Sequence, residues 1–567
     1  MNIEELKQRA ASGDAEAQYK LGECYYNGDD IKQDDEAAVL WFKESAGQGY
    51  TPAYKALGDC YIFGYGVEQE YEEAVKWWRL AAKQGNAEAQ NNLAIAYANG
   101  DGVEQNYEEA VKWWRLAAEQ GLVEAQHNLG YAYKRGEGVE QNFEEAVKWF
   151  RLAAEQGLVE AQYNLGNAYK RGEGVEQNFE EAVKRWHLAA EQELVEAQYN
   201  LGYAYKCGEG VERNFEEAVK WYRLAAEQGD NDAQNTLGVC YAKGEGVEQN
   251  FEEAVKWYHL AAEQGLVEAQ YNLGNAYKRG EGVEQDFEEA VKWWRLAAEQ
   301  GLVEAQHNLG YAYKCGEGVE QNYEEAVKWC RLAAEQGNDK AQYNLGIAFQ
   351  FGAGVEQSME EAVKWWQLSA EQGFVEAQKK LGGIYIRGEG VEQNDKEAAK
   401  WILLAAEQND TSSQNVMGII YHFGDGVEQN YEEAVKWWRL AAEQGNDKAQ
   451  YNLGVCYYEG TGVEEDLEEA VKWWRLAAEQ GNDKTQYNLG VCYYEGTGIE
   501  EDLEEAVKWW RLAAEQGYAF AQLCLGNAYA DGDGVEQNFE EAVKWYRLAA
   551  EKGNEDAKEA LERLQNE

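Results

Sequence analysis

The sequence predicts an all-α solenoid of about 15 helix–turn–helix repeats of 36 residues, with no strands. Three observations predict it. A Leu-Gly pair, or a close variant, recurs every 36 residues without insertion or deletion, apolar residues within each repeat follow helical spacing, and no segment alternates with period two. Because one helix pair cannot bury its apolar faces alone, successive repeats are expected to stack around a continuous core.

The repeats form one uninterrupted array. We expect an N-terminal capping helix at residues 1–14, a continuous array of 15 repeats at 15–553, and a C-terminal capping helix at 554–567. The anchors that set this register are Leu21, Leu57, Leu93, Leu129, Leu165, Leu201, Leu237, Leu273, Leu309, Leu345, Leu381, Met417, Leu453, Leu489, Leu525 and Leu561.

The copy around Leu165 illustrates the first helix of a repeat. Val159–Arg171 places Ala161, Leu165 and Ala168 on one apolar stripe, which predicts a helix. Gly166 lies inside this helix, where only close approach of a partner helix justifies a glycine. The following Gly-Glu-Gly-Val segment, which begins at Gly172, predicts a turn.

The second helix is expected at Phe179–Gln192. Asn178 precedes it as an N-cap, and Glu181 follows three residues later in an Asn variant of the capping box. A glycine such as Gly157 closes the second helix of most copies, which predicts a left-handed residue there.

The composition excludes several classes of protein. With 52 basic and 105 acidic residues the net charge is -53, so a phosphate backbone would be repelled over most of the surface. No apolar run reaches the ~18–20 residues of a membrane helix, and the start lacks the pattern of a secretory signal. We expect no nucleic acid, no membrane insertion and a cytoplasmic location, with non-classical export left open.

Neither the cysteines nor the histidines indicate a site. The nine cysteines include no zinc-type spacing, and five of them follow the Leu-Gly pair as small hydrophobes; their odd number fits a reducing compartment. The five histidines never take a metal-ligand spacing, and no catalytic or phosphate-loop motif occurs. We expect no enzyme activity, no cofactor and no metal. The 22 tryptophans fall at two adjacent places of the second helix and indicate packing.

The repeat pattern resembles that of the Sel-one-like repeat (SLR) family, relatives of the tetratricopeptide repeat. The resemblance is carried by the Leu-Gly pair, Tyr169, the G-x-G-V turn, the Ala-x-x-Trp of the second helix and the closing Ala-Ala-Glu-Gln-Gly, and it covers essentially the whole chain. It implies a right-handed α-solenoid whose first helices line a concave groove, and a scaffold or adaptor role in assembling other proteins. Several bacterial members of the family are linked to signalling, secretion, virulence or host contact.

Variable residues of the first helix are the candidates for partner binding. They lie at −2, +2, +5 and +6 from the anchor leucine, mostly on one face, and their central copies make a basic and aromatic strip on an acidic molecule. Asn residues before the anchor join them, since Asn with Lys or Arg resembles the carboxylate-holding residues of some tetratricopeptide grooves. The candidate groove residues are His127, Tyr131, Lys134, Arg135, Tyr163, Asn164, Asn167, Lys170, Arg171, Tyr199, Tyr203, Lys206, Tyr271, Lys278, Arg279, His307, Tyr311 and Lys314.

Two interpretations of this strip stay open. The cations could bind a partner, or they could complement helix dipoles and be neutralised by neighbouring Glu residues. Our first hypothesis is a monomeric, non-catalytic scaffold that holds an extended or acidic peptide of a protein partner. The alternative is a host- or surface-directed binding protein, and a hydrolase is a distant third.

The fifth repeat departs from the pattern. Arg185 replaces the tryptophan found in 14 of 15 copies, and Glu193 stands where glycine is usual; Asn409 is the other exception at that place. The fifth repeat is either a bend or weak point in the array or the product of drift in a tandem duplication.

Overall fold

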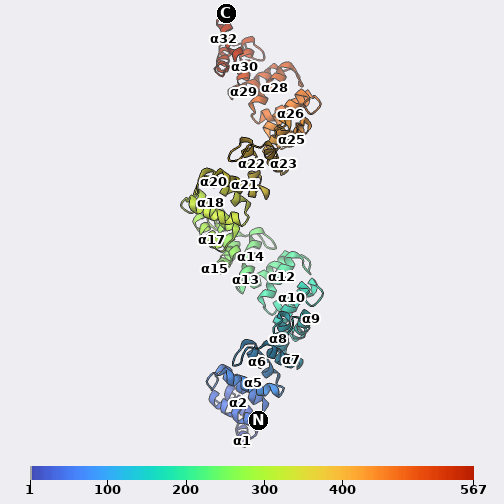
Figure 1. Ribbon diagram of the computed structural model, residues 1–567, viewed down its shortest axis with the longest axis vertical. Coiled ribbons are helices and arrows are strands. Elements are labelled where there is room, and N and C mark those ends of the chain that lie inside the picture. Colours follow the sequence, from blue (N-terminus) through green and yellow to red (C-terminus); the bar gives the residue numbers. More distant parts are fainter. Residues whose placement is uncertain (1–2, 567) are drawn as a thin grey trace. The chain divides into compact units, whose positions relative to one another are not determined.

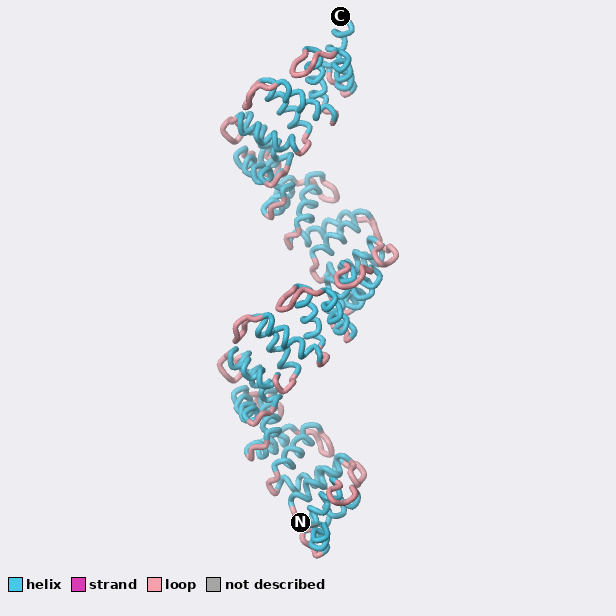
Figure 2. Tube along the Cα trace, turned by 180° about the vertical axis from the view of Figure 1, so that it is seen from behind, coloured by secondary structure: helices cyan, strands magenta, loops and turns pink. Residues whose placement is uncertain are grey.

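The computed structural model describes residues 3–566 of the chain. These residues form 32 α-helices and no strand (Figure 2), which confirms the all-α prediction. The chain divides into two compact units, Met1–Gln285 and Asp286–Glu567. Each unit is a stack of helix pairs that follow one another in chain order (Figure 1).

The first unit contains sixteen helices within its described residues. They are α1 (Ile3–Ala11), α2 (Ala15–Asn27), α3 (Asp35–Gly47), α4 (Thr51–Phe63), α5 (Tyr71–Lys83), α6 (Ala87–Asn99), α7 (Tyr107–Glu119), α8 (Val123–Arg135), α9 (Phe143–Glu155), α10 (Val159–Arg171), α11 (Phe179–Ala190), α12 (Val195–Cys207), α13 (Phe215–Glu227), α14 (Asn231–Lys243), α15 (Phe251–Glu263) and α16 (Val267–Arg279).

The second unit contains the other sixteen described helices. They are α17 (Phe287–Glu299), α18 (Val303–Cys315), α19 (Tyr323–Glu335), α20 (Asp339–Phe351), α21 (Met359–Glu371), α22 (Val375–Arg387), α23 (Asp395–Glu407), α24 (Thr411–Phe423), α25 (Tyr431–Glu443), α26 (Asp447–Glu459), α27 (Leu467–Glu479), α28 (Asp483–Glu495), α29 (Leu503–Glu515), α30 (Ala519–Asp531), α31 (Phe539–Glu551) and α32 (Glu555–Asn566).

Local signals in the sequence define the helix ends. The first helix of the reference copy, α10, has the predicted bounds, and Asn178 caps α11 by accepting a 3.0 Å hydrogen bond from the Glu181 amide. The predicted end of α11 at Gln192 is wrong, because the helix closes at Ala190 just before Glu193, which has a φ of 67°. The equivalent Gly157 has a φ of 93°, as its place after α9 predicts.

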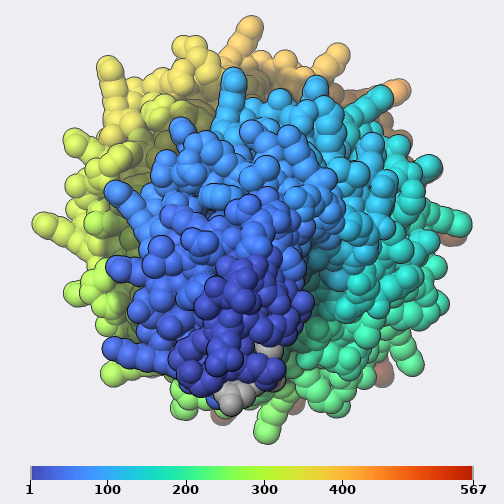
Figure 3. Space-filling view, turned by 90° about the horizontal axis from the view of Figure 1, so that it is seen from below, coloured from blue at the N-terminus to red at the C-terminus, as the bar shows by residue number. Residues whose placement is uncertain are grey.

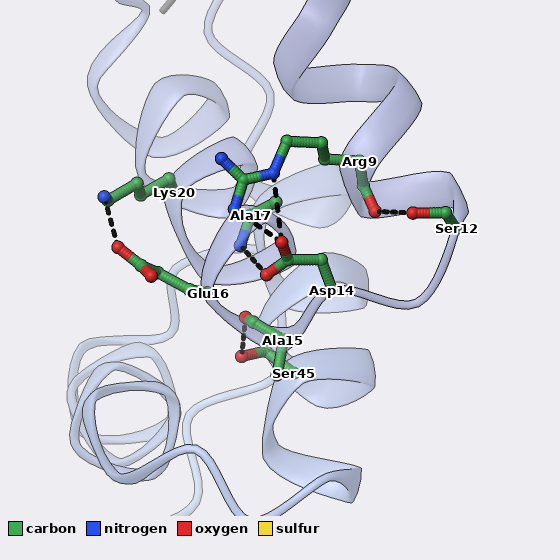
Figure 4. Close-up of polar contacts among 8 residues, drawn as sticks. All are labelled: Arg9, Ser12, Asp14, Ala15, Glu16, Ala17, Lys20 and Ser45. Atoms are coloured by element: carbon green, nitrogen blue, oxygen red, sulfur yellow. Dashed lines mark hydrogen bonds and ion pairs between the residues drawn. The ribbon is translucent and has the colours of Figure 1, made fainter.

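The N-terminal end of the first unit is closed by α1, whose residues are the darkest blue in Figure 3. Asp14 caps α2 by accepting from the Ala17 amide at 3.1 Å, and the Arg9 guanidinium at the end of α1 donates to the same carboxylate (Figure 4). Ser45 of α3 donates its hydroxyl to the Ala15 carbonyl at 2.6 Å. These contacts join the first three helices.

An aromatic residue, most often tryptophan, packs on a glycine and joins the two helices of most repeats. Trp186 of α11 is only 2% exposed and lies against Gly166 of α10, where an added Cβ would meet the indole Cδ1 at 2.6 Å. The neighbouring first tryptophan position contacts the previous repeat, since Trp221 of α13 packs on the α11–α12 cluster. The two tryptophan positions therefore hold the helix pair together and stack one pair on the next, as the packing interpretation predicts.

A second glycine allows the backbone of one repeat to lie in close contact with the backbone of the preceding repeat. Gly174 has a φ of 71°, and a Cβ there would lie 2.1 Å from the Phe143 carbonyl of the preceding repeat. The close approach of the preceding repeat therefore requires glycine here. The first copy carries Asp30 at the equivalent place, with a φ of 58°.

A buried glutamine links three helices in nearly every repeat. Gln90 of α6 donates its amide to the Ala82 carbonyl of α5 at 3.0 Å and accepts from Gln120, just after α7, at 2.7 Å. Such internally satisfied polar groups favour one register, since a shifted stack would leave them unpaired.

The fifth repeat lacks one of these contacts. Arg185 of α11 lies 3.7 Å from Glu181 of its own helix, and its buried Nε has no hydrogen-bond partner among the described residues. The α9–α10 cluster accordingly has no tryptophan from α11 packed upon it. Glu193 adds a left-handed backbone without glycine.

The nine cysteines are free thiols in the described structure. Cys60, Cys240, Cys456 and Cys492 are buried at the same place of their first helices, as predicted for small hydrophobes, whereas Cys24 at the end of the stack is half-buried.

Candidate partner-binding face

The predicted strip lies on first helices, and the two units are described separately. In the first unit α8, α10 and α12 carry its residues in three successive repeats, α14 interrupts the pattern, and α16 resumes it. Tyr271, Lys278 and Arg279 are on α16. His307, Tyr311 and Lys314 are on α18 of the second unit.

His127 and Asn164 form a contact between neighbouring repeats. Asn164 is only 7% exposed, and its amide lies 3.2 Å from His127 Nε2. The His127 ring also packs on Tyr131 and Phe150, with ring centroids 5.5 and 5.7 Å apart, and burial lowers its pKa. This pair supports the scaffold and fixes the position of α10 beside α8.

The asparagine before the anchor makes the same kind of contact elsewhere. Asn128 donates to Asn91 at 3.2 Å, and Asn272 donates to Asn235 at 3.0 Å, each from one repeat to the previous one. These amides are engaged in a ladder between first helices.

The lysines at +5 differ from the paired lysine in the first half of most second helices, such as Lys184. Within the described residues the ammonium groups of Lys134, Lys170 and Lys206 form no ion pair with a carboxylate. Lys134 lies 5.5 Å from the Tyr131 ring, and Lys170 lies 5.0 Å from the Tyr203 ring of the next repeat. Lys134 and Lys170 contact aromatic faces, and none of the three ammonium groups has a carboxylate counter-ion among the described residues.

The arginines at +6 are instead neutralised locally. Arg135 pairs with Glu137 at 3.5 Å, Arg171 with Glu173 at 3.6 Å and Arg279 with Glu281 at 3.7 Å, all through the turn that follows the first helix. Lysines of the second helices are also paired with a glutamate of the preceding turn, as in Lys184 with Glu181 at 2.7 Å. Of the two interpretations, local neutralisation describes the arginines and partner binding stays a prediction for the lysines.

The polar and aromatic members of the strip are partly used in packing. Asn167 accepts from the Trp186 indole at 3.2 Å, and Tyr163 packs on the α11–α12 cluster. Tyr199 packs on Tyr222 with centroids 5.6 Å apart, and burial raises its pKa. Tyr203 is 39% exposed and contributes its ring to the surface.

Near the C-terminus the same face becomes acidic. In the second unit Glu459 and Glu495 line a cavity of about 280 Å³ together with Tyr451, Tyr458 and Trp474. The first-helix face thus carries lysines in some repeats and carboxylates in others, as the sequence indicates.

The sequence interpretation missed a cavity in the second unit. It has a volume of about 270 Å³ and lies between α18, α19 and α20, beside Lys314 and Cys330. Its signal in the sequence is Cys330, which replaces the aromatic residue that most copies carry at this place of the second helix.

The described part of the chain has neither a metal-binding cluster nor a membrane-spanning helix. No group of three or more His, Cys, Asp or Glu side chains is arranged to hold a metal ion. No described helix combines the length and apolar character that crossing a bilayer requires.

Known proteins with similar sequences and structures share the repeat. The Sel1 repeat pattern matches fifteen times in succession, over residues 15–482 and 484–554. No curated protein matches the chain. A protective antigen from uropathogenic Escherichia coli with an SLR fold is 37% identical, covers 80% of this chain and 97% of its own, and has a TM-score of 0.60. A Sel1 repeat protein from Oxalobacter formigenes is 34% identical over 55% of this chain and 90% of its own, with a TM-score of 0.45.

These matches confirm the resemblance that the repeat pattern indicates. Sel1 repeat proteins are typically non-catalytic scaffolds, and they generally mediate protein–protein interactions. Since the pattern matches almost the whole length of the array, the chain belongs to the Sel1 repeat family.

Proposed function

We propose that this protein is a non-catalytic scaffold that holds an acidic segment of a protein partner against its first helices. The observation that carries the proposal is the set of Lys134, Lys170 and Lys206, which occupy the same place on α8, α10 and α12 and have no ion pair within the described structure. On a chain with a net charge of -53, three such cations in successive repeats favour a ligand with spaced carboxylates.

The surroundings of Lys170 favour binding at low entropic cost. The ammonium of Lys170 lies between the Trp186 and Tyr203 rings, 5.6 and 5.0 Å from their centroids, and the His127–Asn164 contact links the neighbouring helices. A side chain that already rests on aromatic faces loses less freedom when a carboxylate arrives.

Affinity should depend on several contacts and on salt. An exposed ion pair contributes ~0–1 kcal/mol, so one lysine alone gives little binding. Three pairs on adjacent repeats add, and salt screens all of them at ionic strengths of about 0.1 M and above. Negative charge elsewhere on the surface disfavours ordinary polyanions.

The test is a charge reversal with a matched control. The partner is first captured from native lysate at low salt and identified, and its affinity for the purified chain is then measured. Lys134→Glu, Lys170→Glu and Lys206→Glu together should abolish this binding while helicity and melting stay nearly unchanged. The control carries Glu459→Lys and Glu495→Lys on the acidic face and should bind normally. Retention of the partner by the triple variant and its loss in the control would move the binding site to the acidic repeats.

A second candidate function is supported by one comparison. The 37% identical relative is described as a protective antigen of uropathogenic Escherichia coli, which favours a surface- or host-directed binding protein. Fractionation of the producing cells tests it. Protein at the cell surface or in the medium would support this alternative, and protein confined to the cell interior would contradict it.

A further inference from the structure

Two repeats lack the aromatic residue that most second helices place against the glycine of the first helix. Thirteen of the fifteen copies carry Trp, Tyr or Phe at the second tryptophan position, whereas Cys330 and Ile402 are the exceptions. In the following repeat Trp366 occupies this place, is fully buried, and lies against Gly346. At Gly310 the corresponding neighbour is only the Cys330 thiol.

Cys330 lines the cavity of about 270 Å³. A cavity of about 280 Å³ lies at the same place beside Trp474, but its lining includes Glu459 and Glu495, whereas the cavity beside Cys330 has no carboxylate in its lining. Val327 and Cys330 of α19 line it together with Ile347 and Ala348 of α20, so the walls are apolar. At the other exception the larger Ile402 side chain packs on Gly382, with its Cδ1 2.4 Å from an added Cβ. The cavity is slightly smaller than the ~300–1,000 Å³ of pockets for drug-sized ligands and suits one ring system.

The cavity opens at the surface next to an apolar edge and a positive charge. Phe351 of α20 lines it and is 69% exposed, and Tyr323 at the start of α19 is exposed beside it. Lys314 of α18 is the one charged residue of its lining, and its ammonium forms no ion pair within the described residues. A ring in the cavity would cover apolar surface, and a carboxylate next to the ring would meet the ammonium group.

We propose that this cavity binds an aromatic side chain of a partner protein, with the ring where other repeats place their own and with an adjacent carboxylate at Lys314. A peptide segment is favoured over a free aromatic acid because Phe351 and Tyr323 extend the apolar surface beyond the cavity, where neighbouring residues of a chain would lie. The inference deepens the proposed function, on which it rests for the source of the ligand.

The experiment titrates small probes into the full-length chain by calorimetry and ligand-observed NMR. The probes are indole-3-propionate, which has a ring and a carboxylate, tryptamine, which has a ring and a cation, and a blocked Glu-Trp-Glu tripeptide. Cys330→Trp places an indole ring against Gly310, in the part of the cavity lined by Val327, and Cys330→Phe serves if that variant fails to fold. Lys314→Gln removes the charge. Cys456→Ala and Lys278→Gln are matched controls at other repeats.

The native chain should bind indole-3-propionate saturably in the millimolar range or tighter, and the tripeptide at least as tightly. The Cys330→Trp substitution should abolish binding of indole-3-propionate and of the tripeptide and should raise the melting temperature. Lys314→Gln should weaken the binding of these two ligands by about fivefold, and tryptamine should bind the native chain more weakly than indole-3-propionate does. The two controls should bind as the native chain does. Absence of saturable binding, equal binding by the Cys330→Trp variant, or tighter binding of the free acid than of the tripeptide would overturn the proposal. These experiments do not involve Lys134, Lys170 and Lys206. A failure of the cavity proposal can therefore be distinguished from a failure of the proposed function.

Discussion

Replacing Glu193 by glycine should stabilise the fifth repeat. Glu193 has a φ of 67° in the left-handed region, where the equivalent residues Gly157 and Gly229 have φ values of 93° and 97°. A Cβ built on either of those glycines meets no atom within 4 Å, so crowding does not oppose the glutamate. The backbone conformation is therefore the whole of its cost at this place.

The magnitude follows from two opposing contributions. A non-glycine residue in the left-handed conformation costs roughly 1–2 kcal/mol, and replacing it by glycine removes this strain. Glycine gains freedom in the unfolded chain, which costs about 0.4–1 kcal/mol in return. The net gain for Glu193→Gly is about 1 kcal/mol. Asn409→Gly is the matched control; it should gain less, because asparagine tolerates its φ of 65° more readily.

Hydrogen exchange resolves this change better than global melting, since long repeat arrays lose two-state behaviour. In the native chain, amides at 179–195 should exchange faster than those at 287–303, because Arg185 and Glu193 both weaken the fifth repeat. Glu193→Gly should slow exchange at 179–195 by about fivefold. Equal protection of the two segments, or unchanged exchange in the variant, would refute the reasoning.

Two further substitutions test the packing and the titration of the first unit. Gly174→Ala should destabilise its repeat by about 3 kcal/mol or more in urea titrations, since the new Cβ would lie 2.1 Å from the Phe143 carbonyl. The control Gly157→Ala adds a Cβ that meets no atom within 4 Å and should cost only about 1 kcal/mol. Equal losses of stability in the two variants would contradict the backbone contact. Burial lowers the pKa of His127, so the unfolded chain takes up the proton first and the native chain loses stability as the pH falls below about 6.5. The substitution His127→Tyr, which copies Tyr163 of the next repeat, should remove this loss of stability. Melts of both proteins at about pH 7.5 and about pH 5.5 measure this difference, and parallel pH dependence would contradict it.

The sequence by itself determined the repeat, the fold class and most helix bounds. The apolar stripe of Val159–Arg171, the N-cap Asn178 and the left-handed Gly157 are local features, whose effects depend on residues within about one helical turn. Repetition made the prediction from each of these features more certain, because fifteen copies of one pattern are compatible with few other folds. The end of α11 was predicted two residues too late, since closure before Glu193 differs from closure before glycine.

Only the tertiary structure decided how the candidate strip is used. The arginines at +6 meet glutamates of their own turns, the asparagine at −1 meets a side chain 37 residues earlier, and the lysines at +5 meet neither. Gly174 is required by a carbonyl 31 residues earlier. The cavity beside Cys330 is lined by residues of α18, α19 and α20, which lie up to 37 residues apart in the sequence (Lys314 and Phe351). These contacts form between repeats, where the stacking geometry determines which side chains meet. The spacing of residues along a single helix does not predict them.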